Sequence, residues 1–217
     1  MNKFALVSDF DGTISDDDFF YYITAKYLSK KALAPWEEYL AGKKTHFNAL
    51  KEIFAKLRVK ESDLVDFILQ IRWDKGFEKA VKLCHVRGMP VYITSAGCDY
   101  YIRLLIGELM NDYNITLVTN YSFYSEEMGL EMVKPARDYK YYDENNGVDK
   151  AKVVEELQEK GYKVIYCGDG IPDVGAAKIA DVVFAKKTLL ERCNEACIHT
   201  KPFDSFEDVC RFIEENA

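Results

Sequence analysis

The sequence predicts an α/β fold, a parallel β-sheet with helices on both faces and a small helical insertion after the first strand. From about residue 76 to the C-terminus, short apolar runs alternate with segments of helical periodicity, as in sheets of parallel strands. Between residues 16 and 73, apolar residues instead recur at helical spacing with no evident strand. A chain of 217 residues is long enough for one core with such an insertion.

The expected elements follow in chain order. Apolar runs predict strands at residues 4–8, 90–94, 115–118, 163–167 and 182–184. Helical spacing predicts helices at residues 77–86, 101–109, 149–160, 174–179 and 189–193, and a last helix that starts with the capping-box-like sequence Asp204-x-x-Glu207. Residues 121–133 favour a β-hairpin, and residues 134–147 indicate a polar loop.

The insertion is expected to form a domain of its own. Its apolar pattern predicts three or four helices within residues 16–73. We therefore expect a core domain of residues 1–15 and 74–217 and a helical cap domain of residues 16–73.

Charge and hydropathy exclude several classes of partner. The net charge of −7 makes the chain a poor general binder of nucleic acid or of anionic membranes, because its field repels phosphate. The N-terminus lacks the pattern of a cleavable signal peptide, and no apolar run is long enough to span a bilayer. We expect a cytoplasmic protein, a monomer or homodimer, that binds neither nucleic acid nor membrane.

Three candidate strands end in short polar turns. These turns are Asp9-Phe10-Asp11-Gly12-Thr13, Ser95-Ala96-Gly97 and Gly168-Asp169-Gly170-Ile171-Pro172-Asp173. Ligands of open α/β sheets bind beyond the carboxyl ends of the strands. The three turns are therefore expected to meet at one edge of the sheet.

These turns carry four carboxylates, Asp9, Asp11, Asp169 and Asp173. Taken alone, each acidic pair is equally well a solvated turn, because Asp and Gly are common turn residues. Carboxylates gathered after buried strands repel one another and need a cation or a shared proton. Hard oxygen ligands in small number suit Mg²⁺, so the four together predict a magnesium site.

The motifs and their order resemble those of the haloacid dehalogenase (HAD) phosphatases. The segment from Asp9 to Thr13 is similar to the family's DxDGT signature, Ser95 to its second motif, and the turn from Gly168 to Asp173 to its acidic motif. The family also places a lysine before the acidic motif, and Lys150 fits. The resemblance implies a Rossmann-like, HAD-like core with a C1 cap, the helical domain that closes over the site.

The resemblance also implies roles. Asp9 is the expected nucleophile, which forms an aspartyl-phosphate, and Asp11 the expected acid and base. Mg²⁺ is expected at the carboxylates of Asp9 and Asp169 and the backbone carbonyl of Asp11, with Asp173 orienting a metal-bound water or Lys150. The expected phosphate-binding groups, side chains or backbone N–H, come from Gly12, Thr13, Ser95, Ala96, Gly97 and Lys150.

Several choices stay open. Lys134 and Lys152 are alternatives to Lys150. The run Asp16-Asp17-Asp18 is either an N-terminal helix cap or a contact for a substrate amine. Arg58, Arg72, Lys43 and Lys44 are cap cations that could meet a substrate carboxylate, although solvated surface is the simpler interpretation of each.

The expected substrate is a small phosphorylated metabolite. The segment from Ser95 to Ile102 resembles the methionine-salvage branch of the family, which favours the enol phosphate of that pathway. Phosphoserine is an alternative substrate. A phosphomutase, or a phosphonatase with a Schiff-base lysine among Lys26, Lys30, Lys43 and Lys44, is an alternative enzyme. A receiver-like phosphate-binding module is the alternative that is not an enzyme, but it has no need of Asp11.

Overall fold

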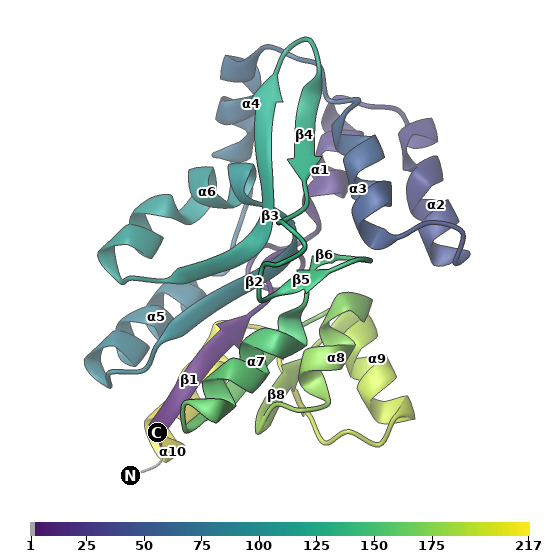
Figure 1. Cartoon of the computed structure of the whole chain (residues 1–217). Coiled ribbons are helices and arrows are strands. Elements are labelled where there is room, and N and C mark those ends of the chain that lie inside the picture. Colours follow the sequence, from purple (N-terminus) through teal and green to yellow (C-terminus); the bar gives the residue numbers. More distant parts are fainter. Residues whose placement is uncertain (1–2) are drawn as a thin grey trace.

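A computed structural model of the chain describes residues 3–217. Within this range the central sheet has seven strands in the order β4-β3-β2-β1-β7-β8-β9 (Figure 1). All neighbours pair in parallel except β3 and β4, which are antiparallel. The strands are β1 (Lys3–Ser8), β2 (Val91–Cys98), β3 (Thr116–Ser125), β4 (Gly129–Val133), β7 (Tyr162–Gly168), β8 (Val182–Ala185) and β9 (Lys201–Pro202).

Helices cover both faces of this sheet. In Figure 1, α5 and α6 lie to the left of β1, and α7 and α8 lie to its right. The helices of the core are α5 (Lys75–Val86), α6 (Asp99–Asp112), α7 (Lys150–Glu159), the 3-10 turn η2 (Ile171–Asp173), α8 (Val174–Ala177), α9 (Lys187–Glu195) and α10 (Phe206–Asn216). The predicted α/β fold is confirmed.

The central strand β1 explains why the sheet needs helices on both sides. Phe4 and Leu6 belong to one apolar cluster, together with side chains of α5, α6 and α10. Ala5 and Val7 belong to a second cluster, together with side chains of α7 and α8. Successive side chains of a strand point to opposite faces, so an unbroken apolar run is buried only when both faces are covered.

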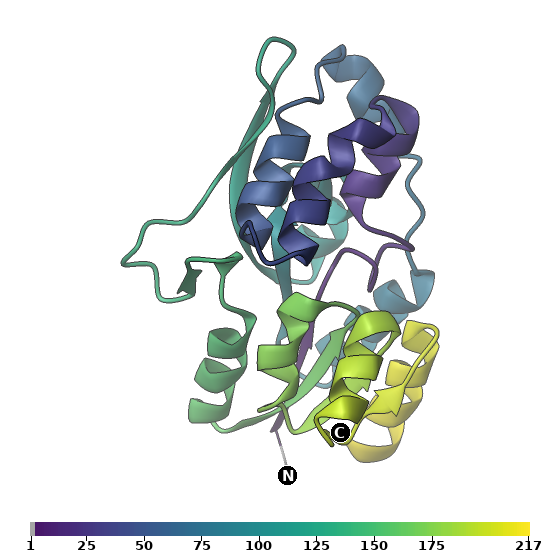
Figure 2. The same ribbon diagram turned by 90° about the vertical axis from the view of Figure 1, so that its right-hand side faces the viewer.

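A layer of helices lies beyond the carboxyl end of β1 (Figure 2). It contains α1 (Phe19–Lys26), the 3-10 turn η1 (Lys30–Leu33), α2 (Ala34–Leu40), α3 (His46–Phe54) and α4 (Glu61–Ile68). An isolated β-bridge joins Ser15 and Trp73, so the chain leaves and re-enters the core at adjacent points. The division into core and cap domains at these positions stays a prediction.

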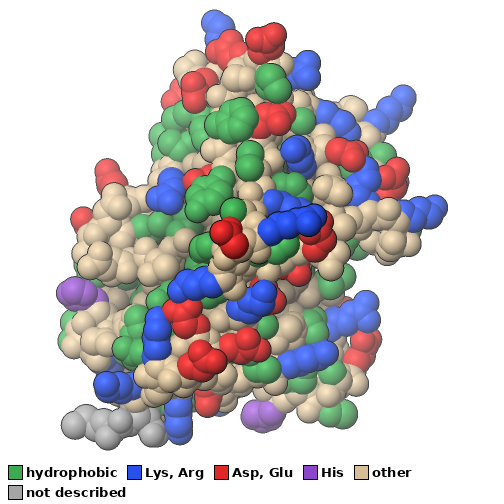
Figure 3. Space-filling model, in the orientation of Figure 1, with side chains coloured by type: hydrophobic (Ala, Val, Ile, Leu, Met, Phe, Trp, Pro, Cys, Tyr) green, Lys and Arg blue, Asp and Glu red, His purple; other side chains and the backbone are tan. Residues whose placement is uncertain are grey.

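The hairpin of β3 and β4 extends from the sheet into the helical layer. The hydroxyl of Tyr124 in β3 accepts a bond of 3.0 Å from the backbone N–H of Val59 and donates to its carbonyl at 2.5 Å. Figure 3 shows hydrophobic side chains gathered over this part of the surface, where Tyr121 and Phe123 are exposed. The β3–β4 hairpin therefore contacts the helices on one side and carries exposed apolar residues on the other.

Some elements differ from the expectation. The segment 134–147, expected to be a loop, contains the first strand of a small hairpin made of β5 (Tyr142–Asp143) and β6 (Gly147–Val148), and β9 had no apolar signal. The last helix begins after Ser205 rather than Asp204, because the Ser205 hydroxyl accepts the N–H of Glu207 at 3.3 Å. No helix within residues 3–217 has the length and apolar character needed to cross a bilayer.

Candidate active site

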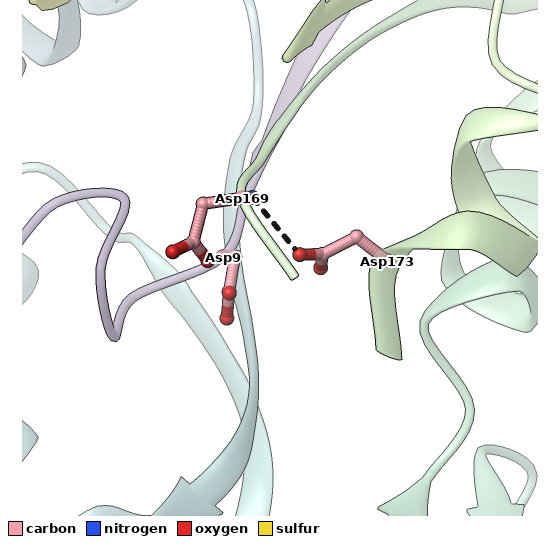
Figure 4. A group of neighbouring side chains, drawn as sticks. All are labelled: Asp9, Asp169 and Asp173. Carbon is pink, nitrogen blue, oxygen red and sulfur yellow. Dashed lines mark hydrogen bonds between the residues drawn. The ribbon is translucent and has the colours of Figure 1, made fainter. Parts of the chain in front are cut away.

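Three buried carboxylates meet where β1 and β7 end. Asp9 follows β1, Asp169 follows β7, and Asp173 closes the turn η2. One carboxylate oxygen from each lies within 4.8 Å of the others (Figure 4). The two strands pair in parallel up to Ser8 and Cys167, so the residues that follow them are brought side by side. This group is called the carboxylate cluster below.

Lys150, the first residue of α7, lies within the carboxylate cluster. Its Nζ atom is 2.7 Å from Oδ1 of Asp9 and 2.7 Å from Oδ1 of Asp173. The two other candidate lysines bond elsewhere: Lys134 to the carbonyl of Glu144, and Lys152 to the carbonyl of Tyr142. The structure thus brings Lys150 to the cluster and places the ammonium groups of the two alternatives outside it.

The carboxylate cluster holds more negative charge than its surroundings offset. Burial, followed by the charge of Asp173, raises the pKa of Asp9 well above its usual value. Burial and Asp173 also raise the pKa of Asp169, to about 6. Burial alone would lower the pKa of Lys150, but Asp173 and Asp9 outweigh it and raise that pKa. Both oxygens of Asp173 already accept hydrogen bonds, Oδ1 from Lys150 and Tyr166 and Oδ2 from the N–H groups of Asp169 and Gly170. The carboxylates of Asp9 and Asp169 are therefore the hard oxygen donors left to fit a divalent cation.

The side chain of Asp11 bonds to groups outside the carboxylate cluster. Its Oδ2 atom accepts hydrogen bonds from the hydroxyls of Tyr101 at 2.5 Å and Ser95 at 3.1 Å. Its Oδ1 atom accepts the backbone N–H of Phe19 at 3.1 Å. Burial raises the pKa of this carboxyl, while these bonds oppose the rise. The carboxylate of Asp11 is therefore fixed by neutral donors, and only its backbone carbonyl is assigned to a metal contact.

Of the expected phosphate-binding residues, Gly12 and Thr13 lie against Asp169 and are not among the residues that line the cavity above the carboxylate cluster. Gly12 has a φ of +69°, and a Cβ there would lie 2.2 Å from Oδ2 of Asp169, so both its backbone and its surroundings require glycine. The Thr13 hydroxyl is 3.4 Å from Oδ1 of Asp169. Ser95, Ala96 and Gly97 were expected to form a turn after the strand, but they lie within β2, where the register with β3 is irregular between Thr94 and Cys98. The Ser95 hydroxyl accepts the N–H of Gly97 at 2.9 Å in this irregular end of the strand. Ser95, Ala96 and Gly97 all line the cavity.

Asn120, in the neighbouring strand β3, holds Ala96 and Gly97 in place. Its buried amide donates to the carbonyls of Ala96 at 3.1 Å and Gly97 at 3.0 Å. Neither Asn120 nor Tyr101 was identified from the sequence. Tyr101 sits in an apolar helical pattern, and Asn120 is one polar residue in a strand, so neither carried a signal of its own.

The cavity above the carboxylate cluster has a volume of about 480 Å³. Its far wall comes from the helical layer and is largely aromatic. The side chains of this wall are Phe20, Tyr21, Trp36, Tyr39, His46 and Phe54. The cavity is of the size that suits a small molecule.

The cap cations do not line this cavity. Among residues 3–217, the basic side chains at the cavity wall are Lys150 and Lys187. Lys44 instead pairs with Glu38 and Glu52. Lys187, which was not identified from the sequence, adopts a φ of +49° and lies 3.2 Å from Oδ2 of Asp169. Both cavity cations therefore already have a carboxylate partner on the core side.

Asp18 occupies the N-cap position of α1 but makes no capping hydrogen bond with its side chain. It lines the cavity instead. Burial, followed by the charges of Asp11 and Asp169, raises its pKa to about 8. The backbone of Asp18 thus occupies the helix-cap position, as the first interpretation expected. Its carboxyl group does not cap the helix and faces the cavity instead.

Comparison with known proteins identifies the family of this site. A model of the haloacid dehalogenase-like hydrolases matches residues 6–178. The chain belongs to this family.

Relatives of this haloacid dehalogenase-like hydrolase span nearly all of its length. The 2-hydroxy-3-keto-5-methylthiopentenyl-1-phosphate phosphatase of Geobacillus thermodenitrificans is 30% identical, over 98% of this chain and 96% of the relative. The polyol phosphate phosphatase of Saccharomyces cerevisiae is 26% identical, over 99% and 94%. A substrate-bound phosphoserine phosphatase structure shares the fold, with a TM-score of 0.71 at 16% identity over 98% of this chain and 99% of that one. This hydrolase is a phosphatase of the family.

Proposed function

We propose that this phosphatase is a Mg²⁺-dependent phosphomonoester hydrolase that acts on a small metabolite through an aspartyl-phosphate on Asp9. The observation that carries the proposal is the difference between two neighbouring carboxylates. Asp9 lies in the carboxylate cluster against Lys150, whereas Asp11 is held by the neutral donors of Ser95, Tyr101 and Phe19. Two carboxylates in different environments suit two different roles.

Asp9 is assigned the nucleophilic attack. Its Oδ1 atom accepts the backbone N–H of Phe10 at 2.7 Å and contacts Lys150, which leaves Oδ2 for the phosphorus. In the first step Oδ2 forms a bond to phosphorus and the ester P–O bond breaks. Asp11 gives its proton to the departing alkoxide oxygen, which leaves as an alcohol. The raised pKa of Asp11 favours the protonated form that this step requires.

The second step reverses the use of Asp11. Its carboxylate accepts a proton from a water molecule, whose oxygen attacks phosphorus while the bond from phosphorus to Oδ2 of Asp9 breaks. Inorganic phosphate leaves and both carboxyl groups return to their starting states. Ser95 and Lys150 hold the phosphoryl oxygens during both steps. Mg²⁺ bound by Asp9, Asp169 and the Asp11 carbonyl, with Asp173 behind them, would supply the positive charge that lets two anions approach.

The cavity wall favours an uncharged substrate chain. A substrate carboxylate, as in phosphoserine, would meet no cation from the helical layer among residues 3–217. The alternative of a phosphonatase is likewise unsupported, since none of Lys26, Lys30, Lys43 and Lys44 lines the cavity. We therefore propose the methionine-salvage enol phosphate, or a phosphate ester of similar size without a carboxylate, as substrate. A cytoplasmic location and a monomeric or homodimeric state stay predictions.

Phosphate release from a panel of monoesters tests the proposal. The panel contains the salvage enol phosphate, glycerol 3-phosphate, phosphoserine and p-nitrophenyl phosphate, each with Mg²⁺. The wild-type protein should release phosphate, Asp9→Asn should not, and Asp112→Asn, an exposed change at the end of α6, should behave as wild type. Turnover by Asp9→Asn at the wild-type rate would refute the mechanism, and phosphoserine as the best substrate would refute the substrate class.

A further inference from the structure

His46 is a buried polar residue in the cavity wall that the proposed mechanism does not use. It is the first residue of α3, directly after the N-cap Thr45, whose hydroxyl accepts the N–H of Asn48 at 3.2 Å. The side chain is only 7% exposed. Its ring packs edge-on against Trp36 at 5.4 Å and Tyr39 at 5.2 Å between centroids, and all three residues line the cavity. The imidazole is therefore fixed in orientation by aromatic neighbours.

The imidazole lacks the partners that a buried histidine usually has. Its Nδ1 atom is buried with no hydrogen-bond partner among residues 3–217. A nitrogen this deeply buried is also out of reach of a molecule in the cavity, so Nδ1 does not bind one. Nε2 is not among the fully buried, unpartnered atoms of residues 3–217, and His46 lines the cavity, so Nε2 is the nitrogen that can reach a molecule there.

The charge state of His46 limits what it can bind. Burial, followed by the positive charge of Lys150, lowers its pKa to about 3, so the ring is neutral at physiological pH. A neutral imidazole has one donor and one acceptor nitrogen. It offers no charge to a carboxylate, and several carboxyl groups that line the same cavity, among them Asp11, Asp18 and Asp169, disfavour a second anion there. A hydroxyl group can serve either tautomer, because it both donates and accepts.

We propose that His46 is a specificity-determining residue that hydrogen-bonds through Nε2 to an uncharged hydroxyl on the substrate chain, while Trp36 and Tyr39 pack against the carbons beside it. This inference rests on the proposed function and names the chemical group that the cavity selects. A chain with a hydroxyl gains the bond to the ring. A chain of the same length without one makes no such bond.

A matched series of esters tests this role. The series is glycerol 3-phosphate, 3-hydroxypropyl phosphate and propyl phosphate, which share three carbons and differ only in hydroxyl groups. In His46→Phe, which keeps an aromatic ring but has no nitrogen, kcat/KM for a hydroxylated ester should fall about tenfold, the equivalent of one hydrogen bond. For propyl phosphate it should stay within about twofold, which also shows that the variant folds and that its chemistry is intact.

Two further variants complete the design. His46→Gln keeps a neutral donor and acceptor, so it should retain a preference for the hydroxylated esters. His85→Phe changes an exposed histidine of α5 and should leave the whole series unchanged. The fall in His46→Phe should appear mainly in KM, because the contact is made in both ground and transition states.

The outcomes separate this inference from the proposed function. Equal losses for hydroxylated and plain esters in His46→Phe, or no loss for any, would overturn the role of His46 while phosphate release by the wild type still stands. No phosphate release from any ester by the wild type, or turnover that survives Asp9→Asn, would instead overturn the proposed function.

Discussion

The carboxyl end of β2, where Gly97 lies, offers a sharp test of how Asp11 is held. In Gly97→Ala, the new Cβ would lie 1.9 Å from the Tyr101 hydroxyl and 2.9 Å from Oδ2 of Asp11. Carbon and oxygen need roughly 3.3 Å, so the hydroxyl must move by about 1.4 Å. The displaced Tyr101 loses its 2.5 Å bond to Asp11, and the acid/base group shifts with it. A misplacement of about 1 Å can cost roughly 100-fold in rate, and we expect kcat to fall by about that factor.

The steady-state rate on p-nitrophenyl phosphate and the thermal midpoint together measure this effect. Gly107→Ala is the matched control, because nothing lies within 4 Å of a Cβ at that helical position. It should leave kcat unchanged and stabilise the fold by about 0.5–1 kcal/mol. In the double variant with Tyr101→Phe the clash is relieved, so the two changes should cost less together than the sum of their separate effects. Wild-type kcat in a folded Gly97→Ala protein would refute the account of Asp11.

The other predictions concern charge in and around the site. With a chelator present, Lys150→Met should lower the free energy of unfolding by about 3–5 kcal/mol, because Asp9 and Asp173 are then buried without an ammonium group beside them. Lys152→Met, a change at an exposed lysine, should leave the free energy of unfolding unchanged. Equal denaturation midpoints for the two variants would contradict this. The pKa of Asp18 rises from 3.8 to about 8 on folding, so the native state holds more protons between these values and stability should fall as pH rises through that window. Urea unfolding at pH 5 and pH 8 should show a smaller fall in Asp18→Asn, and an equal fall would show that this carboxyl does not titrate there. Removal of divalent metal should abolish phosphate release while circular dichroism shows the fold intact. Added Mg²⁺ should restore activity and raise the thermal midpoint. Activity in excess chelator would refute the metal requirement.

The strand pattern and the motifs predicted most of the core and which acidic residues come together at the ends of β1 and β7. Apolar runs were enough to locate β1, β7 and β8, because strands buried on both faces need them. Parallel pairing then brings the strand ends together, which is why Asp9 and Asp169 could be expected side by side. The resemblance favoured Lys150 over Lys134 and Lys152, but only the structure shows its ammonium group beside Asp9, since the position of a lysine side chain depends on how its helix packs.

The missing parts of the prediction depend on contacts between distant segments. Asn120 bonds the carbonyls of Ala96 and Gly97 at the end of β2 only because β3 lies beside β2. His46 reaches the cavity only because α2 and α3 pack together over the core, and its ring meets Trp36 there. Periodicity indicates which side chains are buried but not which of them share a cavity. Buried polar residues such as Asn120 and His46 therefore cannot be recognised from the local sequence pattern.

The strand β3 has a consequence for the mechanics of this enzyme. One end of this strand pairs with the part of β2 that carries Ser95 and Gly97. Its other end carries β4 and is bonded through Tyr124 to Val59 in the helical layer. A second tie runs from the N–H of Phe47 to the carbonyl of Asn145 at 2.9 Å. Outward movement of the helical layer must therefore flex a continuous strand or part these bonds. A displacement of the helical layer would thus be passed along β3 to the residues of β2 that line the cavity, Ser95, Ala96 and Gly97.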